Sequence, residues 1–117
     1  MRTLVRNGLV ITAAEESTAD VLIEDEKVVA LATTGSSVAQ SWTADTEIDA
    51  TGCYVVPGGV DGHTHMEMPF GGTTASDTFE TGTRAAAWGG TTTIVDFAIQ
   101  SMGATLREGL DLSLIHI

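Results

Sequence analysis

The sequence predicts an α/β protein that opens with a small layer of β-strands and continues into a βαβ unit. Residues 1–50 contain short segments in which polar and apolar residues alternate, as they do in half-buried strands. From Cys53 onward the pattern becomes strand, loop, helix and strand. Such a βαβ unit implies a parallel sheet with a right-handed crossover. The change near residue 50 therefore predicts two units, residues 1–52 and residues 53–117.

The first unit is expected to form one small antiparallel layer. Asn7-Gly8 is typical of a tight hairpin turn, and Asp25-Glu26 is a second hairpin-like connection. The strands expected around these turns are residues 4–6, 9–11, 20–24, 27–31 and 46–50. A layer this thin cannot bury both of its faces alone, so we expect it to pack on something outside this chain.

The second unit begins with an apolar strand at residues 54–57. A helix is expected over residues 78–88, started by Ser76 or by Asp77 with Glu80 as a capping box, and ended by a Gly-Gly pair. The β-branched run at residues 91–97 is typical of a buried strand. This series is one βαβ unit.

Composition excludes several classes of partner. The 117 residues carry 5 basic against 16 acidic side chains, a formal net charge of -11, so neither nucleic acid nor an anionic membrane surface is an expected partner. Cys53 is the only cysteine, which rules out an internal disulfide and fits a reducing cytoplasm. No signal peptide or bilayer-length apolar stretch is evident in the sequence. We therefore expect a soluble, cytoplasmic protein.

His63 and His65 give the strongest chemical signal. In an extended segment, residues two apart point to the same face, so both imidazoles project together. Two convergent imidazoles form half of a first-row metal site, with Zn–N distances of about 2.0–2.1 Å. A His-x-His pair alone can also arise by chance on a surface strand. Its position at the carboxyl end of a strand in a βαβ setting favours a metal site.

Four motifs resemble the amidohydrolase superfamily, specifically the D-hydantoinase/dihydropyrimidinase branch. They read VPGGVDGHTH at residues 56–65, MPFGGT at 68–73, DTFETGTRAAA at 77–87 and GGTTT at 89–93. The first motif is found across the superfamily. The second is more specific to this branch and separates it from dihydroorotases and allantoinases. The resemblance covers residues 1 to about 111.

This resemblance implies that the chain holds the first βαβ units of a (β/α)₈ TIM-type barrel, preceded by part of a small β-sandwich assembled from both chain ends. The fold would be incomplete as given. The resemblance also implies two divalent metal ions, usually zinc, with His63 and His65 as ligands of the more buried one. The other family ligands are a bridging carboxylated lysine, two histidines and an aspartate, all expected beyond residue 117. Lys27, the only lysine, lies in the first unit.

The implied reaction is the hydrolytic opening of a cyclic amide or imide, such as a dihydropyrimidine or a 5-substituted hydantoin. In this family a hydroxide that bridges the two metals attacks the carbonyl carbon. The implied partner is a small-molecule substrate, and the full-length parent is expected to be a homotetramer or homodimer. The chain itself is expected to be an N-terminal piece that is inactive alone. Residues 112–117 depart from the family pattern and are expected to be non-native.

Three further residues are candidates for the site, each with an alternative role. Asp61 could orient an imidazole from outside the ligand set, or could cap a turn as a loop carboxylate. By resemblance, Met68 and Phe70 contact the substrate's exocyclic group, whereas the alternative is ordinary packing of the loop. Asp96 ends the second strand of the βαβ unit, where a hydrogen-bonding role is expected.

Two other functions stay open at this point. The first is another cyclic amidohydrolase, allantoinase-like or dihydroorotase-like. The second is a non-catalytic, dihydropyrimidinase-like scaffold protein. Such scaffolds have generally lost metal ligands, and both His63 and His65 are present here.

Overall fold

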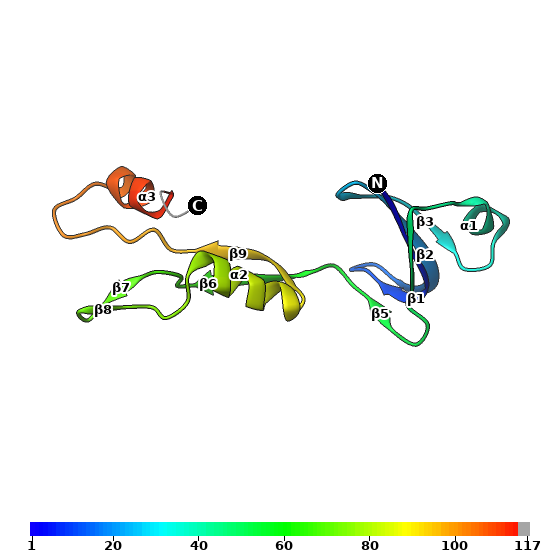
Figure 1. The fold of residues 1–117 in the computed structure, drawn as a ribbon, viewed down its shortest axis with the longest axis horizontal. Helices are drawn as coiled ribbons and strands as arrows, with labels where there is room; N and C mark the ends of the chain where they lie inside the picture. The colour runs from blue at the N-terminus through cyan, green and yellow to red at the C-terminus, as the bar shows by residue number, and fades with distance from the viewer. Residues whose placement is uncertain (115–117) are drawn as a thin grey trace. The chain divides into compact units, whose positions relative to one another are not determined.

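The computed structural model describes residues 1–114, and the side chains of these residues apart from Phe70 and residues 112–114. The chain divides into two compact units, Met1–Pro57 and Gly58–Ile117, which are drawn in Figure 1. The division falls a few residues later than the one expected after residue 52. The reason is that β5 (Tyr54–Val55) pairs in parallel with β1 (Arg2–Ile11), and so belongs to the first unit.

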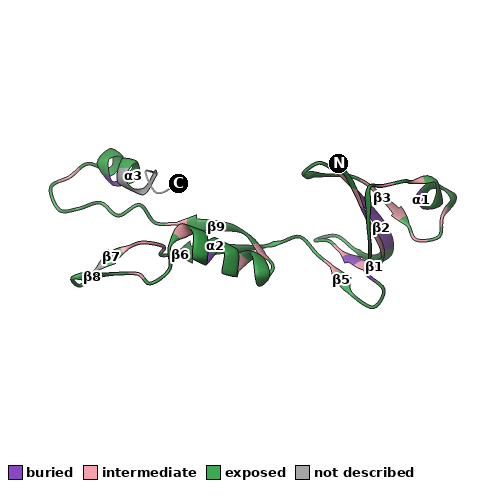
Figure 2. Cartoon of the chain, in the orientation of Figure 1, coloured by how far each residue is buried: buried purple, intermediate pink, exposed green. Residues whose placement is uncertain are grey.

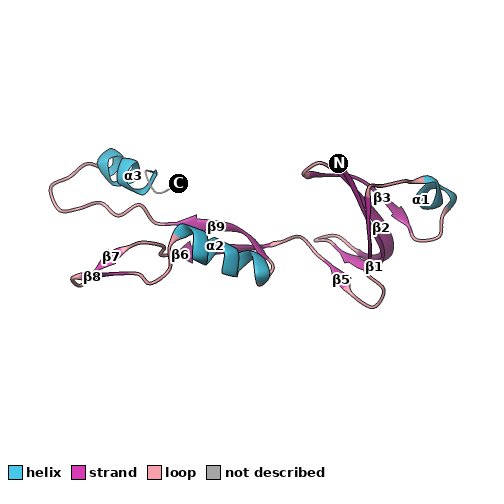
Figure 3. Ribbon diagram, in the orientation of Figure 1, coloured by secondary structure: helices cyan, strands magenta, loops and turns pink. Residues whose placement is uncertain are grey.

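The first unit is a mixed five-stranded sheet in the order β3-β2-β1-β4, with β5 also paired to β1. Strand β2 (Glu16–Glu24) pairs antiparallel with β1 on one side and with β3 (Lys27–Thr33) on the other (Figure 3). Strand β4 (Thr46–Asp49) instead runs parallel to β1. The expectation of a purely antiparallel layer is therefore wrong. Helix α1 (Ser37–Ser41) lies between β3 and β4 in the chain, so these two strands are not joined by a hairpin.

The Asn7-Gly8 pair does not form the expected hairpin turn. Strand β1 continues through it as a β-bulge, in which Arg6 and Asn7 together lie opposite Asp20 on β2. Asn7 does take the positive φ that an Asn-Gly turn would need, at 64°. Its backbone N–H donates to Asp20 Oδ1 at 3.0 Å. The expected connection at Asp25 is confirmed, since Glu24 and Lys27 pair across it.

Buried residues of the first unit lie on both faces of its sheet. Leu4 and Leu22 pair in register on one face, and a cluster around Val21 lies on the other. Val10, Ala19 and Val21 are buried there, with Val5, Ile23 and Val55 packed against them. Leu31 pairs with Val21 in register and therefore shares this face, yet it is 54% exposed. Figure 2 shows how limited the buried part of this layer is. This face is only partly covered within the unit, as its thinness predicted.

The second unit contains the expected βαβ arrangement. Strands β6 (Gly59–Thr64) and β9 (Thr91–Asp96) pair in parallel, with helix α2 (Phe79–Trp88) between them in the chain. A two-stranded hairpin, β7 (Pro69–Phe70) with β8 (Thr73–Thr74), lies between β6 and α2 in sequence. The unit ends in α3 (Leu106–Leu114). This confirms the fold class, because a β-rich first part is followed by a parallel βαβ unit.

Helix α2 begins one residue later than the Asp77–Glu80 pattern predicted. Thr78 is the N-cap, and its hydroxyl accepts from the Thr81 N–H at 3.1 Å. In return, Thr81 Oγ1 accepts from the Thr78 N–H at 2.9 Å, which completes a capping box. Asp77 instead accepts a hydrogen bond from the Thr81 hydroxyl at 3.3 Å.

Helix α3 is the last element that the structure describes. Residues 115–117, and the side chains of residues 112–114, lie outside the described part. The expectation that residues 112–117 are non-native therefore stays a prediction. Within residues 1–114, no helix has the length and apolar character needed to cross a membrane.

Candidate metal centre

His63 and His65 converge at the end of β6. His63 lies within the strand, and His65 follows its last residue, Thr64. The two Nε2 atoms are 2.9 Å apart, and the ring planes meet at 85° with centroids 4.8 Å apart. Both residues are exposed. The spacing of two in an extended segment has therefore placed both ring nitrogens on one side of the chain, as predicted.

This geometry fits one edge of a metal site. Two nitrogens bound tetrahedrally to zinc at about 2.0–2.1 Å would lie about 3.3 Å apart, a few tenths of an ångström more than observed here. Among residues 1–114, no group of three or more His, Cys, Asp or Glu side chains gathers in a way that could hold a metal ion. The described residues thus offer two nitrogen donors and not a closed set.

Phe97, directly after β9, lies against both imidazoles. Its ring centroid is 4.6 Å from that of His63 and 5.3 Å from that of His65, with tilts of 45° and 40°. No pattern in the sequence predicted a role for this residue. Its position depends on the pairing of Thr64 with Asp96, which brings the ends of β6 and β9 together. An aromatic residue directly after the second strand was the available signal.

Two carboxylates fix the backbone around the histidines. Asp61 Oδ1 accepts from the backbone N–H of His63 at 3.1 Å, so its bond is to the main chain and not to an imidazole. Asp96 Oδ1 accepts from Thr64 Oγ1 at 3.1 Å and from the Met66 N–H at 3.3 Å. The hydrogen-bonding role expected for Asp96 is confirmed.

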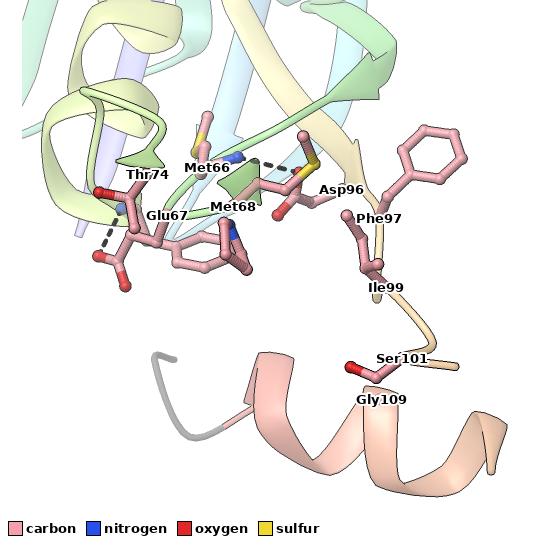
Figure 4. A pocket seen from close by; sticks show the side chains of 11 residues that line it. Met66, Glu67, Met68, Thr74, Asp96, Phe97, Ile99, Ser101 and Gly109 are labelled. Carbon is pink, nitrogen blue, oxygen red and sulfur yellow. Dashed lines mark hydrogen bonds between the residues drawn. The ribbon is translucent and has the colours of Figure 1, made fainter. Parts of the chain in front are cut away.

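A pocket of about 300 Å³ adjoins the histidine pair through Phe97, which lines it and touches both imidazoles. Much of its wall is apolar, including Met66, Met68, Phe79 and Ile99 (Figure 4). Met68 thus lies at the pocket next to the candidate metal site. The side chain of Phe70, the other expected substrate contact, lies outside the described residues.

The loop that follows the histidines is tied to the start of α2. The backbone N–H of Phe79 donates to Glu67 Oε1 at 3.2 Å (Figure 4). The Glu67 N–H donates to the carbonyl oxygen of Asp77 at 2.9 Å. Glu67 has a φ of 52°, so the chain turns sharply here. A carboxylate at a helix N-terminus is electrostatically favourable. These contacts fix the pocket wall beside Met68.

Comparison with known proteins agrees with this arrangement. The sequence profile of the amidohydrolase family matches residues 54–115, which include β6, the histidine pair and β9. The chain belongs to the amidohydrolase family.

Within that family, the resemblance to the D-hydantoinase/dihydropyrimidinase branch is confirmed. A D-hydantoinase of Streptomyces coelicolor is 74% identical over 110 residues, which cover 94% of this chain and 24% of the relative. A crystal structure of D-hydantoinase from Bacillus sp. AR9 is 50% identical with a TM-score of 0.85, covering 97% of this chain and 24% of that one. The dihydropyrimidinase of Brevibacillus agri is 49% identical with a TM-score of 0.89, covering 99% and 24%. The chain therefore spans about a quarter of the length of these relatives.

Proposed function

We propose that the protein to which this chain belongs is a metal-dependent hydrolase that opens cyclic amides, namely 5-substituted hydantoins and dihydropyrimidines. The observation that carries this proposal is the 2.9 Å separation of His63 Nε2 and His65 Nε2 at the end of β6. It occurs in a chain whose relatives are D-hydantoinases. Because the chain spans about a quarter of their length, the activity is assigned to the whole protein.

His63 and His65 would hold one of two divalent metal ions, for which we propose zinc. When bound, such ions polarise a carbonyl group and make water acidic enough to supply hydroxide near neutral pH. Asp61 fixes the main chain at His63 through the bond to its N–H. Phe97 lies against both rings. The remaining ligands are expected outside these 117 residues.

The pocket beside Phe97 supports a substrate with an apolar substituent. Its apolar side chains would bury a group attached to the cyclic amide and so release ordered water. Met68 lines this pocket, and its flexible thioether adapts to substituents of different shape. We propose Met68, together with Phe70, as residues that contact the substituent and influence which substrates are accepted.

The test is an assay of ring opening by the whole protein, expressed from its complete gene, with dihydrouracil and hydantoin as substrates. Turnover should be lost with a chelator, return with zinc, and be absent in His63→Ala and His65→Ala. Arg84→Ala is the control and should leave turnover unchanged, because this exposed side chain pairs with Glu80 alone among the described residues. We expect the 117-residue chain alone to open neither ring.

The other outcomes would each reject part of the proposal. A protein that binds zinc but opens neither ring would be an amidohydrolase with a different cyclic substrate, such as allantoin or dihydroorotate. A protein that binds no metal would be a scaffold. Either result would overturn the assignment as a hydantoin- or dihydropyrimidine-opening enzyme.

A further inference from the structure

One carboxylate oxygen holds the chain on both sides of His65. Asp96 Oδ1 accepts from the hydroxyl of Thr64 and from the backbone N–H of Met66, at 3.1 and 3.3 Å. Thr64 and Met66 are the immediate neighbours of His65. Figure 4 shows the bond from Met66 reaching the Asp96 side chain at the edge of the pocket. The segment that carries this histidine is therefore attached to the end of β9 at two points.

The pairing of β6 with β9 is irregular just before this segment. The register is regular from Val60 to Asp61 and is then interrupted before Thr64 pairs with Asp96. Within the interruption, Gly62 and His63 lie opposite the single residue Val95. His65 follows the last residue of β6. The two bonds to the Asp96 side chain add attachment points directly before and directly after it.

Burial and charge both make the Asp96 bonds effective. Thr64, Met66 and Asp96 are all partly buried, whereas the two histidines are exposed. Hydrogen bonds to an ionised carboxylate are stronger than those between neutral groups. Removing this acceptor would leave the Met66 N–H and the Thr64 hydroxyl without their partner in a partly buried place.

We infer that Asp96 is a positioning residue for His65, acting through Thr64 and Met66 to set the position of the His65 imidazole beside that of His63. The inference rests on the proposed role of the two histidines as metal ligands. Asp61 has the corresponding place at His63, whose N–H it accepts directly. Asp96 differs in that its side chain accepts from the residues on either side of the histidine it positions.

The test measures zinc affinity in the gene-encoded protein by competition with a chromogenic chelator, and the visible spectrum after cobalt substitution. Asp96→Ala should weaken zinc binding about 10- to 100-fold, the usual loss when a residue supporting a metal ligand is removed. It should also change the cobalt spectrum, because that spectrum reports ligand geometry. Asp96→Asn keeps an acceptor oxygen at the same place and should retain most of the affinity. Thr64→Val removes one of the two bonds at nearly constant shape and should give a smaller loss.

Asp77→Ala is the matched control, because Asp77 also accepts from a threonine hydroxyl in the second unit but flanks no histidine. Its zinc affinity should stay within about twofold of wild type. If Asp96→Ala leaves the zinc affinity and the cobalt spectrum unchanged, the inference is overturned while the proposed function stands. Should Asp96→Ala not fold, Thr64→Val decides, and unchanged values there would likewise overturn it. A wild-type protein without zinc affinity would instead refute the proposed function, and this inference with it.

Discussion

The rings of Phe97 and His63 lie 4.6 Å apart between centroids and are tilted by 45°. Phe97 approaches His65 almost as closely, at 5.3 Å. One aromatic ring therefore limits the rotation of both candidate ligands. Contacts between aromatic rings contribute about 0.5–1.5 kcal/mol beyond the area they bury. A ligand pair ordered in this way loses less freedom when a metal ion binds.

Phe97→Ala is therefore expected to weaken zinc binding about 2- to 10-fold, the loss that corresponds to one such ring contact. Phe97→Leu retains apolar bulk and should lose less. Competition with a chelator measures both values. Equal affinity in wild type and Phe97→Ala would show that the ring does not order the histidines. A KM that rises in both variants at constant kcat would indicate that Phe97 contacts substrate through the pocket.

Replacement of Asp20 is expected to destabilise the first unit. It is 2% exposed and accepts from the Asn7 N–H, the Thr34 hydroxyl and the Arg6 guanidinium. Asp20→Ala would leave these donors without that partner, at a cost of about 1–3 kcal/mol for a buried unsatisfied group. Amide hydrogen exchange in β1 and β2 should accelerate accordingly. Asp45→Ala is the control, because the hydrogen bond that its side chain accepts from the Arg2 N–H is exposed.

The same carboxylate predicts a loss of stability in acid. Burial raises the pKa of Asp20, but hydrogen bonds from Asn7, Thr34 and Arg6 together outweigh it and leave the pKa below its usual 3.8. A carboxyl group whose pKa is depressed in the folded state stabilises that state above its unfolded pKa of about 3.9. This contribution begins to be lost as the pH falls below about 4. The loss is complete once the pH has passed below the pKa of Asp20 in the folded state. The urea midpoint should therefore drop below pH 4 in wild type, and drop less in Asp20→Asn. Equal pH dependence in both proteins would contradict this assignment.

Local sequence patterns predicted the structure correctly where it depends on residues close together in the chain. The same-face placement of His63 and His65 follows from the period of two along a strand, and the βαβ order follows from composition and turn residues. Asn7 shows the limit. An Asn-Gly pair predicts a hairpin turn, but the buried carboxylate of Asp20 takes the Asn7 N–H and the chain continues as a bulge. That partner is 13 residues away, and no local pattern identifies it.

The contacts around the histidines show the same limit. Phe97 contacts the histidines, and Asp96 contacts the neighbours of His65, because β6 and β9 pair with Thr64 opposite Asp96. A sequence pattern predicts that two strands are parallel neighbours, but not the register in which they pair. The parallel placement of β4 beside β1 was missed for a related reason, because the path of a chain between strands leaves no periodic signal.

Two glycines, Gly58 just before β6 and Gly62 within it, offer a matched test of the pairing between β6 and β9. A Cβ added to Gly58 would lie 2.1 Å from Thr92 Oγ1 and 2.7 Å from Thr92 Cβ, so the start of the β6–β9 pairing would have to shift. Gly62 has nothing within 4 Å of an added Cβ, although it lies next to His63. Gly58→Ala should cost about 1–3 kcal/mol of stability, as overpacking typically does, and should therefore lower the melting temperature. Gly62→Ala should be neutral or slightly stabilising. Equal melting temperatures would mean that the close approach of Gly58 to Thr92 does not form.

The start of α2 allows the two possible capping boxes to be separated by experiment. If Thr78 is the N-cap, Thr78→Ala removes the acceptor of the Thr81 N–H and should cost about 1 kcal/mol. Asp77→Ala removes only an exposed bond from the Thr81 hydroxyl and should cost less. Urea denaturation of the two variants measures the difference, with Ser76→Ala as a control of similar exposure just before the cap. A larger loss in Asp77→Ala than in Thr78→Ala would restore the Asp77–Glu80 box that the sequence suggested.

Because the loop between His65 and α2 is tied to this helix end through Glu67, a helix that begins at Thr78 also sets where that loop ends.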